Sequence, residues 1–281
     1  MIYVRLMGGL GNQMFQYAAG RRLAISHGTY LVLDLSHLEN QPSEETPRFY
    51  ELNTLKVKAK TTTQLADKKK KSVFKKKPDL LVIQETGLDF DKNILALPDN
   101  VLLIGYWQSY KYFQDAEKQI REDFAFKSPL SSQKEKELQA IKAVKDSVAV
   151  QVRRGDYATN AETNKFHGLI PLDYYKSASR YMAKKLKTPH FFVISDDSEW
   201  CEKNLKLDYP VTFIKSVPGT GHEDMQLMSK CSNHIIANSS FGWWGAWLCD
   251  NQSKKVIAPK QWFKGTNVKM DDRLPPGWTA L

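Results

Sequence analysis

The sequence predicts an α/β protein built from two domains, and three observations lead to this prediction. A short strand at residues 2–6 leads through a glycine-rich turn into a helix and then a second strand. After residue 147, strands and helices alternate, which is typical of a parallel βαβ domain. The chain has 281 residues, enough for two domains of ordinary size. We expect the domains to cover residues 1–146 and 147–281.

The first half contains the more irregular pattern. Its predicted strands are 2–6, 30–33, 80–84 and 101–105, and its predicted helices are 13–27, 110–121 and 131–146. Gly28 is expected to end the first helix and Ser109 to cap the second. The aromatic run at residues 106–110 has two interpretations, a platform that stacks on a sugar ring or ordinary core packing, and core packing is the more common.

The glycine-rich turn at residues 7–13 fits a nucleotide-type domain only in part. Gly9 and Gly11 match the first two glycines of a dinucleotide-binding fingerprint, but Met14 stands at the third position. The N–H groups of the turn and of the helix that follows are suited to receive an anion or a sugar. A tight turn with close helix–strand packing explains the same residues.

The second half alternates regularly. Its predicted strands are 147–150, 190–195, 211–214, 234–237 and 255–258, and its predicted helices are 171–186, 222–230 and one that follows Ser240. Trp243 and Trp247 lie four residues apart on that last helix, so they share a face, which is typical of core packing.

The charge and the cysteines limit the function and the compartment. The net charge of +10 and the pI near 9.3 indicate an anionic partner, which is a nucleotide, a nucleic acid or an acidic membrane surface. The three cysteines lack CxxC spacing, which argues against a disulfide scaffold or a zinc site and for a reducing compartment. Because the amino terminus reads as a strand and no apolar run reaches the length of a membrane span, we expect a cytoplasmic protein.

Seven lysines surround Val73 and Phe74 in the run Lys68–Lys77. Such a run is usually a solvated loop. The alternative is weak peripheral contact with anionic lipid at the inner face of the membrane. No aromatic-rich binding pattern accompanies the lysines, so a nucleic-acid partner is not predicted.

Chemistry-bearing residues follow three of the predicted strands in the second half. These are Arg153-Arg154, Asp196-Asp197 and Ser239-Ser240. Since ligands in open α/β sheets bind beyond the carboxyl ends of the strands, we expect these residues to converge. Arginine matches a phosphate bidentately, and hydroxyls at a helix start favour an anion. The plainer interpretation of the first two pairs is a structural Arg–Asp ion pair.

Four stretches resemble bacterial α-1,2-fucosyltransferases of glycosyltransferase family 11. They are Gly8–Ala18, Val152–Tyr157, Phe192–Asp197 and Ala237–Gly245, in the order that the family has them. The resemblance implies a GT-B-like fold with two facing Rossmann-type domains, an acceptor-side domain first and a donor-binding domain second. It also implies transfer of L-fucose from GDP-fucose to the 2-hydroxyl of a galactose-terminated oligosaccharide, with inversion and with neither a metal nor a cofactor.

The residues and the resemblance together give a set of candidate site residues. Catalytic roles are expected for Arg153 and Asp156. Donor binding is expected for Asn12, Gln151, Arg153, Arg154, Asp196, Asn238, Ser239, Ser240 and Phe241. Gln151 stands where the family usually has histidine, which leaves a GDP-sugar-binding protein without turnover as one alternative. Asp196-Asp197 resembles the acidic motif of a metal-dependent GT-A enzyme, the second alternative. The general base stays open between Asp156, Glu162 and Asp34.

Overall fold

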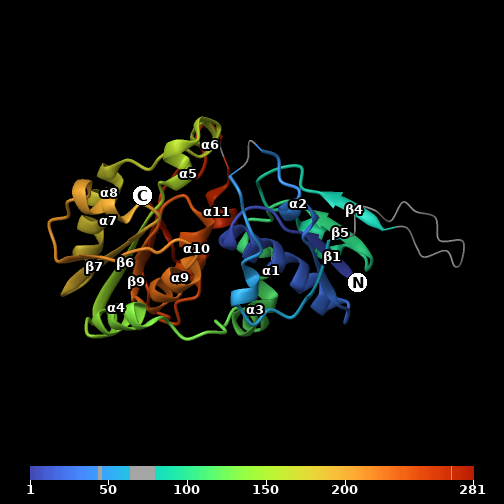
Figure 1. Cartoon of the computed structure of the whole chain (residues 1–281), viewed down its shortest axis with the longest axis horizontal. Coiled ribbons are helices and arrows are strands. Elements are labelled where there is room, and N and C mark those ends of the chain that lie inside the picture. Colours follow the sequence, from blue (N-terminus) through green and yellow to red (C-terminus); the bar gives the residue numbers. More distant parts are fainter. Residues whose placement is uncertain (44–45, 64–79, 267) are drawn as a thin grey trace, which may run out of the picture. The chain divides into compact units, whose positions relative to one another are not determined.

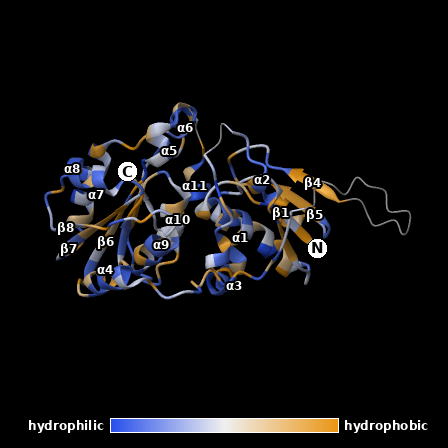
Figure 2. Cartoon of the chain, in the orientation of Figure 1, coloured by the Kyte–Doolittle hydropathy of each residue, from blue (hydrophilic) through white to orange (hydrophobic). Residues whose placement is uncertain are grey.

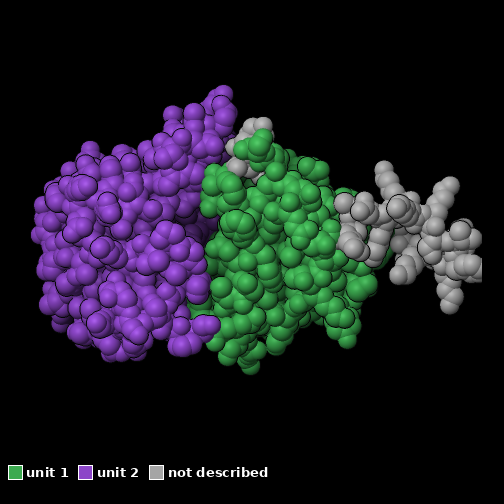
Figure 3. All heavy atoms as spheres, in the orientation of Figure 1, with its two compact units in different colours: residues 1–127 green, residues 128–281 purple. Residues whose placement is uncertain are grey.

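The computed structural model describes residues 1–43, 46–63, 80–266 and 268–281. These residues form two compact units, unit 1 over residues 1–127 and unit 2 over residues 128–281 (Figure 3). The run Lys68–Lys77 lies outside the described residues. Within the described ranges, no helix is both long enough and apolar enough to cross a membrane.

Unit 1 is a parallel sheet with one helix of 17 residues and several short ones (Figure 1). Its elements are β1 (Ile2–Arg5), α1 (Leu10–Ser26), β2 (Leu31–Asp34), α2 (Ser36–Glu39), η1 (Leu52–Thr54), β3 (Lys60–Thr62), β4 (Leu81–Gln84), η2 (Lys92–Ala96), β5 (Val101–Ile104), η3 (Tyr110–Tyr112), η4 (Gln114–Ala116) and α3 (Glu117–Asp123). The strand order is β3-β2-β1-β5-β4, and every neighbouring pair is parallel.

The centre of this sheet is apolar because β1 is covered on both faces. Ile2 and Val4 are fully buried, and β1, β4 and β5 appear in hydrophobic colours in Figure 2. Helix α1 is buried over most of its surface and ends as predicted, since Gly28 follows it with a positive φ of 58°. The β–glycine loop–α–β opening expected from the sequence is therefore confirmed.

Unit 2 is a larger parallel sheet. Its elements are α4 (Ser132–Lys142), β6 (Asp146–Val152), α5 (Gly155–Thr159), α6 (Ala161–His167), α7 (Leu172–Ala183), β7 (Pro189–Ser195), α8 (Ser198–Asn204), β8 (Val211–Phe213), α9 (Gly221–Lys230), β9 (Asn233–Ile235), α10 (Ser240–Trp247), β10 (Val256–Ala258), α11 (Met270–Arg273) and β11 (Thr279–Ala280). The order is β11-β10-β9-β6-β7-β8 and all pairs are parallel. The carboxyl ends of its strands thus share one edge.

The core of unit 2 uses the residues that the sequence periodicity indicates. Val148, Val150 and Val152 of β6 pack with α7 and β7 in one buried cluster. Trp243 and Trp247 are 1% and 6% exposed, so core packing is the correct interpretation of the tryptophans. The three cysteines, Cys201, Cys231 and Cys249, are free and buried.

The division between the units differs from the predicted one at 146/147. It falls between Lys127 and Ser128, because α4 packs against α9 of unit 2. The Lys134 Nζ atom lies 2.7 Å from an Asp224 oxygen, and the Ser131 N–H donates to Glu223. Charged α4 thus belongs with the second unit.

The helix predicted over residues 110–121 is only partly correct. Ser109 does cap a helix, accepting from the Lys111 N–H, but the segment starts as the two short 3-10 turns η3 and η4. The backbone at Phe113 (φ −141°, ψ 11°) separates them, and the α-helix α3 begins only at Glu117.

Candidate functional site

Strand β6 delivers the arginines to the sheet edge. Its alternate residues are buried valines, and the strand is fixed in register with β7 along its whole length and with β9 over Val148–Val150. Arg153 and Arg154 follow the last strand residue, Val152, which pairs with Ser195. The expected convergence of the β6 and β7 ends is therefore present in the structure.

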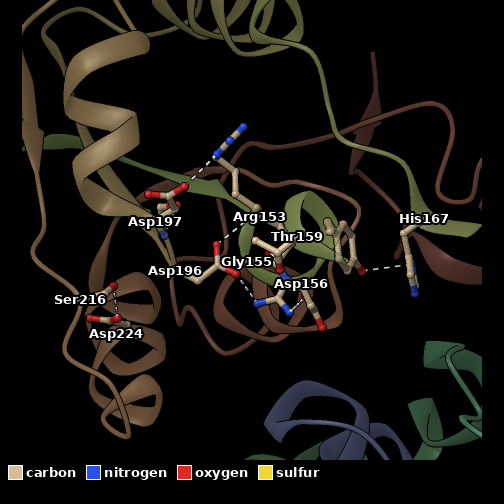
Figure 4. A network of polar contacts seen from close by, with 12 residues as sticks. Arg153, Gly155, Asp156, Thr159, His167, Asp196, Asp197, Ser216 and Asp224 are labelled. Carbon is tan, nitrogen blue, oxygen red and sulfur yellow. Dashed lines mark hydrogen bonds and ion pairs between the residues drawn. The ribbon is translucent and has the colours of Figure 1, made fainter. Parts of the chain in front are cut away.

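Arg153 is held by two carboxylates. One terminal nitrogen donates to Asp196 and the other to Asp156, each at 2.5 Å (Figure 4). The Tyr157 ring lies beside the guanidinium, 5.1 Å from centroid to Cζ. Burial acts to lower the pKa of Arg153, but Asp196 and Asp156 outweigh it and raise the pKa above its ordinary value. The guanidinium is thus charged and fixed in one orientation.

Asp196 organises the turn between β6 and α5. Besides Arg153, it accepts a hydrogen bond from the Arg154 backbone N–H at 2.8 Å. A Cβ at Gly155 would lie 2.4 Å from an Asp196 oxygen, so only glycine permits this approach. Both Asp196 oxygens are engaged by the turn, which agrees with the structural Arg–Asp interpretation. Its donor-binding role stays a prediction.

Arg154 points to a different set of partners. Its Nε donates to Asp197 at 3.1 Å, and its guanidinium lies 3.4 Å from the centre of the Trp200 ring. Asp197 also caps α8 by accepting from the Trp200 N–H. Helix α8 therefore fixes Arg154, and the two adjacent arginines have separate surroundings.

Gln151 and Asn238, both expected to bind the donor, are buried in the framework. Gln151 is 3% exposed, and its Oε1 accepts from the Ala237 N–H at 3.1 Å. A Cβ at Gly242 would lie 2.6 Å from that Oε1, so the glutamine packs directly under α10. Asn238 is 2% exposed and donates to the carbonyl groups of His167 and Trp262. Each joins segments that are distant in the sequence, and their direct donor contacts stay predictions.

Ser239, Ser240 and Phe241 lie at the start of α10. Ser239 is the N-cap in an extended conformation, and within the described part of the chain its side chain makes no capping hydrogen bond. The first N–H groups of a helix lack partners inside the helix and favour an anion. The sheet order places this helix start beside the β6 end, because β9 and β6 are neighbours.

Asn12 belongs to unit 1, in the first turn of α1. Its Oδ1 accepts from Gln108 Nε2 at 2.9 Å.

The three candidates for a general base have different surroundings. Asp34 is fully buried and paired with Arg5 at 2.9 Å, which does not suit it for removing a proton from a substrate. Glu162 is exposed on α6, and Asp156 is paired with Arg153.

His167 is a site residue that the sequence reasoning missed. Its ring stacks on Tyr157, with centroids 4.5 Å apart, and its Nδ1 lies 3.1 Å from the Tyr157 hydroxyl. Burial lowers the pKa of His167 to about 4; Asp156 opposes this, while Arg153 and Arg273 lower the pKa further. The imidazole is therefore neutral at pH 7. A lone histidine at the end of a polar helix gives no sequence signal of this role.

A second polar cluster fixes the loop after β8, at the same edge of the sheet. Lys134 is 1% exposed and donates to the Lys215 carbonyl at 2.5 Å while it pairs with Asp224. Asp224 in turn accepts from Ser216 at 2.6 Å (Figure 4). The buried lysine gave no sequence signal either, since lysines on a charged helix are normally solvated.

In the described ranges, no group of three or more His, Cys, Asp or Glu side chains could hold a metal ion. The adjacent acids Asp196 and Asp197 bind different arginines, as given above. The polar chemistry of this edge is that of fixed guanidinium groups, a helix start and a neutral histidine.

Comparison with known proteins gives consistent matches. The family model described as Glycosyl transferase family 11 matches residues 1–281. An Escherichia coli α-1,2-colitosyltransferase is 35% identical over 295 residues, covering 100% of this chain and 99% of that protein. The Escherichia coli O-antigen biosynthesis glycosyltransferase WbnK is 34% identical, covering 95% of this chain and 96% of that protein. Human galactoside α-(1,2)-fucosyltransferase 1 is 26% identical over 63% of this chain and 54% of its own length.

Among solved structures, an Arabidopsis thaliana FUT1 mutant in complex with GDP matches with a TM-score of 0.51 at 12% identity. The match covers 92% of this chain and 70% of that one. At this identity the likeness concerns the fold alone. The predicted α/β, GT-B-like fold with two Rossmann-type units is confirmed.

Proposed function

The chain belongs to glycosyl transferase family 11, and from that premise we propose that it transfers L-fucose from GDP-fucose to the 2-hydroxyl of a terminal galactoside. In this proposal the configuration at the anomeric carbon inverts and no metal ion takes part. Unit 2 binds the donor and unit 1 the acceptor.

The observation that carries the proposal is the fixed guanidinium of Arg153. The two carboxylates hold it at the end of β6, where ligands of parallel α/β sheets bind. A rigid, permanently charged fork is suited to a diphosphate, since it donates two parallel hydrogen bonds. The start of α10, with Ser239 and Ser240, adds N–H and hydroxyl donors beside it.

The reaction needs these groups because charge develops on the leaving group. The acceptor oxygen forms a bond to the anomeric carbon while the bond from that carbon to the β-phosphate oxygen breaks. The electron pair of the broken bond stays on GDP. Donors fixed before the reaction stabilise this charge more strongly in the transition state than in the ground state. Arg153 is assigned this role, and Asp156 keeps it in place.

The acceptor proton needs a base, and the burial of Asp34 leaves Asp156 and Glu162 as the candidates. A catalytic role of Asp156 fits its place beside Arg153. Glu162 is exposed on α6 and is the second candidate. Asn12, Gln151, Arg154, Asp196, Asn238 and Phe241 keep the donor-binding roles that the resemblance implies. For Gln151 and Asn238, the buried positions favour an indirect role through the backbone of the β9–α10 loop.

A second candidate donor is GDP-colitose. The observation that favours it is the 35% identity, over the whole chain, to a protein named as an α-1,2-colitosyltransferase. Colitose is fucose without its 3-hydroxyl, so one pocket could accept both sugars. Discrimination then depends on whether a buried polar group is left unpaired when that hydroxyl is missing.

The test is a donor and acceptor panel with the purified full chain. GDP-fucose and GDP-colitose are each incubated with a set of β-galactosides, and the products are analysed by mass spectrometry and NMR. Transfer of fucose to the 2-hydroxyl, with an α linkage, supports the proposal. Preferred use of GDP-colitose supports the second candidate. GDP binding without transfer or hydrolysis of either donor indicates a GDP-sugar-binding protein.

Cellular location stays a prediction. We propose a cytoplasmic enzyme whose Lys68–Lys77 run gives weak, salt-sensitive contact with anionic lipid. Cosedimentation with anionic and with neutral vesicles at low salt tests this contact. Equal binding to both kinds of vesicle would contradict it.

A further inference from the structure

The loop after β5 holds a tryptophan in a strained conformation. Trp107 has a φ of +52°, in the left-handed region that bulky residues rarely adopt. The strain is enforced, because the Glu85 carboxylate at the end of β4 accepts from the N–H groups of Tyr106 at 2.6 Å and Trp107 at 3.0 Å. The Ser109 N–H then donates to the Trp107 carbonyl at 2.8 Å. The loop is therefore a fixed structure.

The indole of Trp107 adds a second unfavourable feature. The residue is 1% exposed and lies edge-on to Tyr112, yet its Nε1 has no hydrogen-bond partner among the described residues. A buried donor without an acceptor and a left-handed tryptophan both oppose folding. Features of this kind cluster at functional sites, where the rest of the structure holds them in place.

The strained turn presents two neutral groups. Tyr106 is 40% exposed although its neighbour Trp107 is buried, so the turn sends one aromatic ring outward and the other inward. One residue further on, the Gln108 carboxamide donates to Asn12 at 2.9 Å, which joins the loop to the first turn of α1. An exposed aromatic ring and a carboxamide on the same turn are suited to a sugar, whose C–H face stacks on a ring while its hydroxyls bind amides.

We propose that Tyr106 and Gln108 form a subsite for the pyranoside ring of the acceptor, next to Asn12, which Gln108 contacts and which is expected to bind the donor. This inference rests on the proposed function and assigns the acceptor to named residues of unit 1. The groups are uncharged, which fits a neutral galactoside. The arginines suited to a diphosphate follow β6 in unit 2 instead.

The experiment measures acceptor and donor kinetics separately in the full chain. Tyr106→Ala removes the ring, Tyr106→Phe keeps it, and Gln108→Ala removes the amide. Tyr30→Ala is the matched control, since Tyr30 is 69% exposed in the same unit at the start of β2. Circular dichroism and thermal melting confirm that each variant folds.

We expect Tyr106→Ala and Gln108→Ala to raise the acceptor KM about tenfold, a shift typical of one lost stacking or buried polar contact. In Tyr106→Ala, GDP-fucose hydrolysis without acceptor should keep its KM within about twofold. Tyr106→Phe and Tyr30→Ala should stay near wild type. An unchanged acceptor KM in Tyr106→Ala, or an equal rise in the donor KM, would overturn the proposal.

Failure of the proposed function is distinguishable from failure of the subsite. If no galactoside is a substrate, saturation-transfer NMR of the same variants with methyl β-galactoside and methyl α-fucoside replaces the kinetics. Loss of the galactoside signal in Tyr106→Ala but not in Tyr30→Ala supports the subsite. The absence of any signal in the wild type, or equal signals in wild type and Tyr106→Ala, refutes it.

Discussion

The two sheets of this protein use the same parallel scaffold to present opposite chemistry at their carboxyl edges. In unit 2, the edge carries two arginines and three carboxylates in fixed pairs. In unit 1, the loops after β1 and β5 present the Asn12–Gln108 amide pair and the exposed Tyr106 ring, while Asp34 is withdrawn into a buried pair with Arg5. The comparison teaches that the fold supplies the position of a site, and the strand-end residues decide whether the groups presented there are charged or neutral.

The largest effect is expected from Arg153→Lys. This variant tests whether catalysis needs the planar guanidinium of Arg153 or only its positive charge. Lysine keeps the charge but lacks the planar fork whose two terminal nitrogens donate to Asp196 and Asp156, so kcat should fall by about 10²–10³ while the fold survives. Turnover of GDP-fucose is the measurement. Arg180→Lys is the matched control, because Arg180 forms an exposed pair with Asp208. Near-normal turnover of folded Arg153→Lys would refute the assignment.

Acid should destabilise unit 2 in particular, since the histidines with a lowered pKa, His167, His190 and His234, all lie there. Burial lowers the pKa of His234 to about 3 from its ordinary value of 6.5. Unfolded chains therefore bind this proton first, and stability that is fully present above pH 6.5 is lost as the pH falls toward the folded pKa. We expect the free energy of unfolding to drop by roughly 2–3 kcal/mol for His234 between pH 7 and 4.5.

Urea unfolding followed by tryptophan fluorescence measures this drop, because Trp243, Trp244 and Trp247 report on unit 2. Neither ring nitrogen of His234 has a hydrogen-bond partner among the described residues, so His234→Leu should flatten the pH dependence. His37→Gln in unit 1 is the control. A His234→Leu protein with the wild-type acid dependence would contradict the prediction.

Gly155→Ala tests how precisely Asp196 must hold the Arg153 guanidinium. The new Cβ would lie 2.4 Å from an Asp196 oxygen, so the carboxylate that orients Arg153 must move. We expect kcat/KM for GDP-fucose to fall about tenfold, since a small displacement at a preorganised site is costly. The control is Gly87→Ala, where an added Cβ meets no atom within 4 Å. Equal activity of the two variants would show that the turn tolerates movement.

Chelation should have the smallest effect. If the arginines and the start of α10 supply the positive charge for the diphosphate, excess EDTA leaves the initial rate unchanged within error. The assay uses GDP-fucose and one accepted galactoside, with and without EDTA. A loss of rate that only Mn²⁺ or Mg²⁺ restores would indicate that unit 2 works with a metal as well.

The sequence predicts the strands well where a run of branched residues is buried on both faces, as in β1, β6 and β7. It does not indicate β3 or β11, because these short edge strands are partly exposed and lack an apolar pattern. Helices α5 and α6 were missed for a similar reason, since α6 buries none of its residues. The domain boundary was misplaced because helical periodicity shows that α4 has an apolar face but not which unit covers it.

The candidate site divides in the same way. Arg153, Asp156 and Asp196 could be predicted to meet, because the carboxyl ends of neighbouring parallel strands share an edge. His167 could not, since it joins the site through its stack on Tyr157, a contact between two helices with no periodic signal. The sequence also does not show that Gln151 packs under α10. This packing is possible only because Gly242 has no side chain.

The pairing of β1 also sets an order of assembly during synthesis. Its first neighbour, β2, begins at residue 31, but its second, β5, begins at residue 101, with Ile2 opposite Val101. A nascent chain of fewer than about a hundred residues therefore exposes one edge of β1. Parallel pairs of such long sequence separation close slowly, so unit 1 forms only after most of its length has left the ribosome.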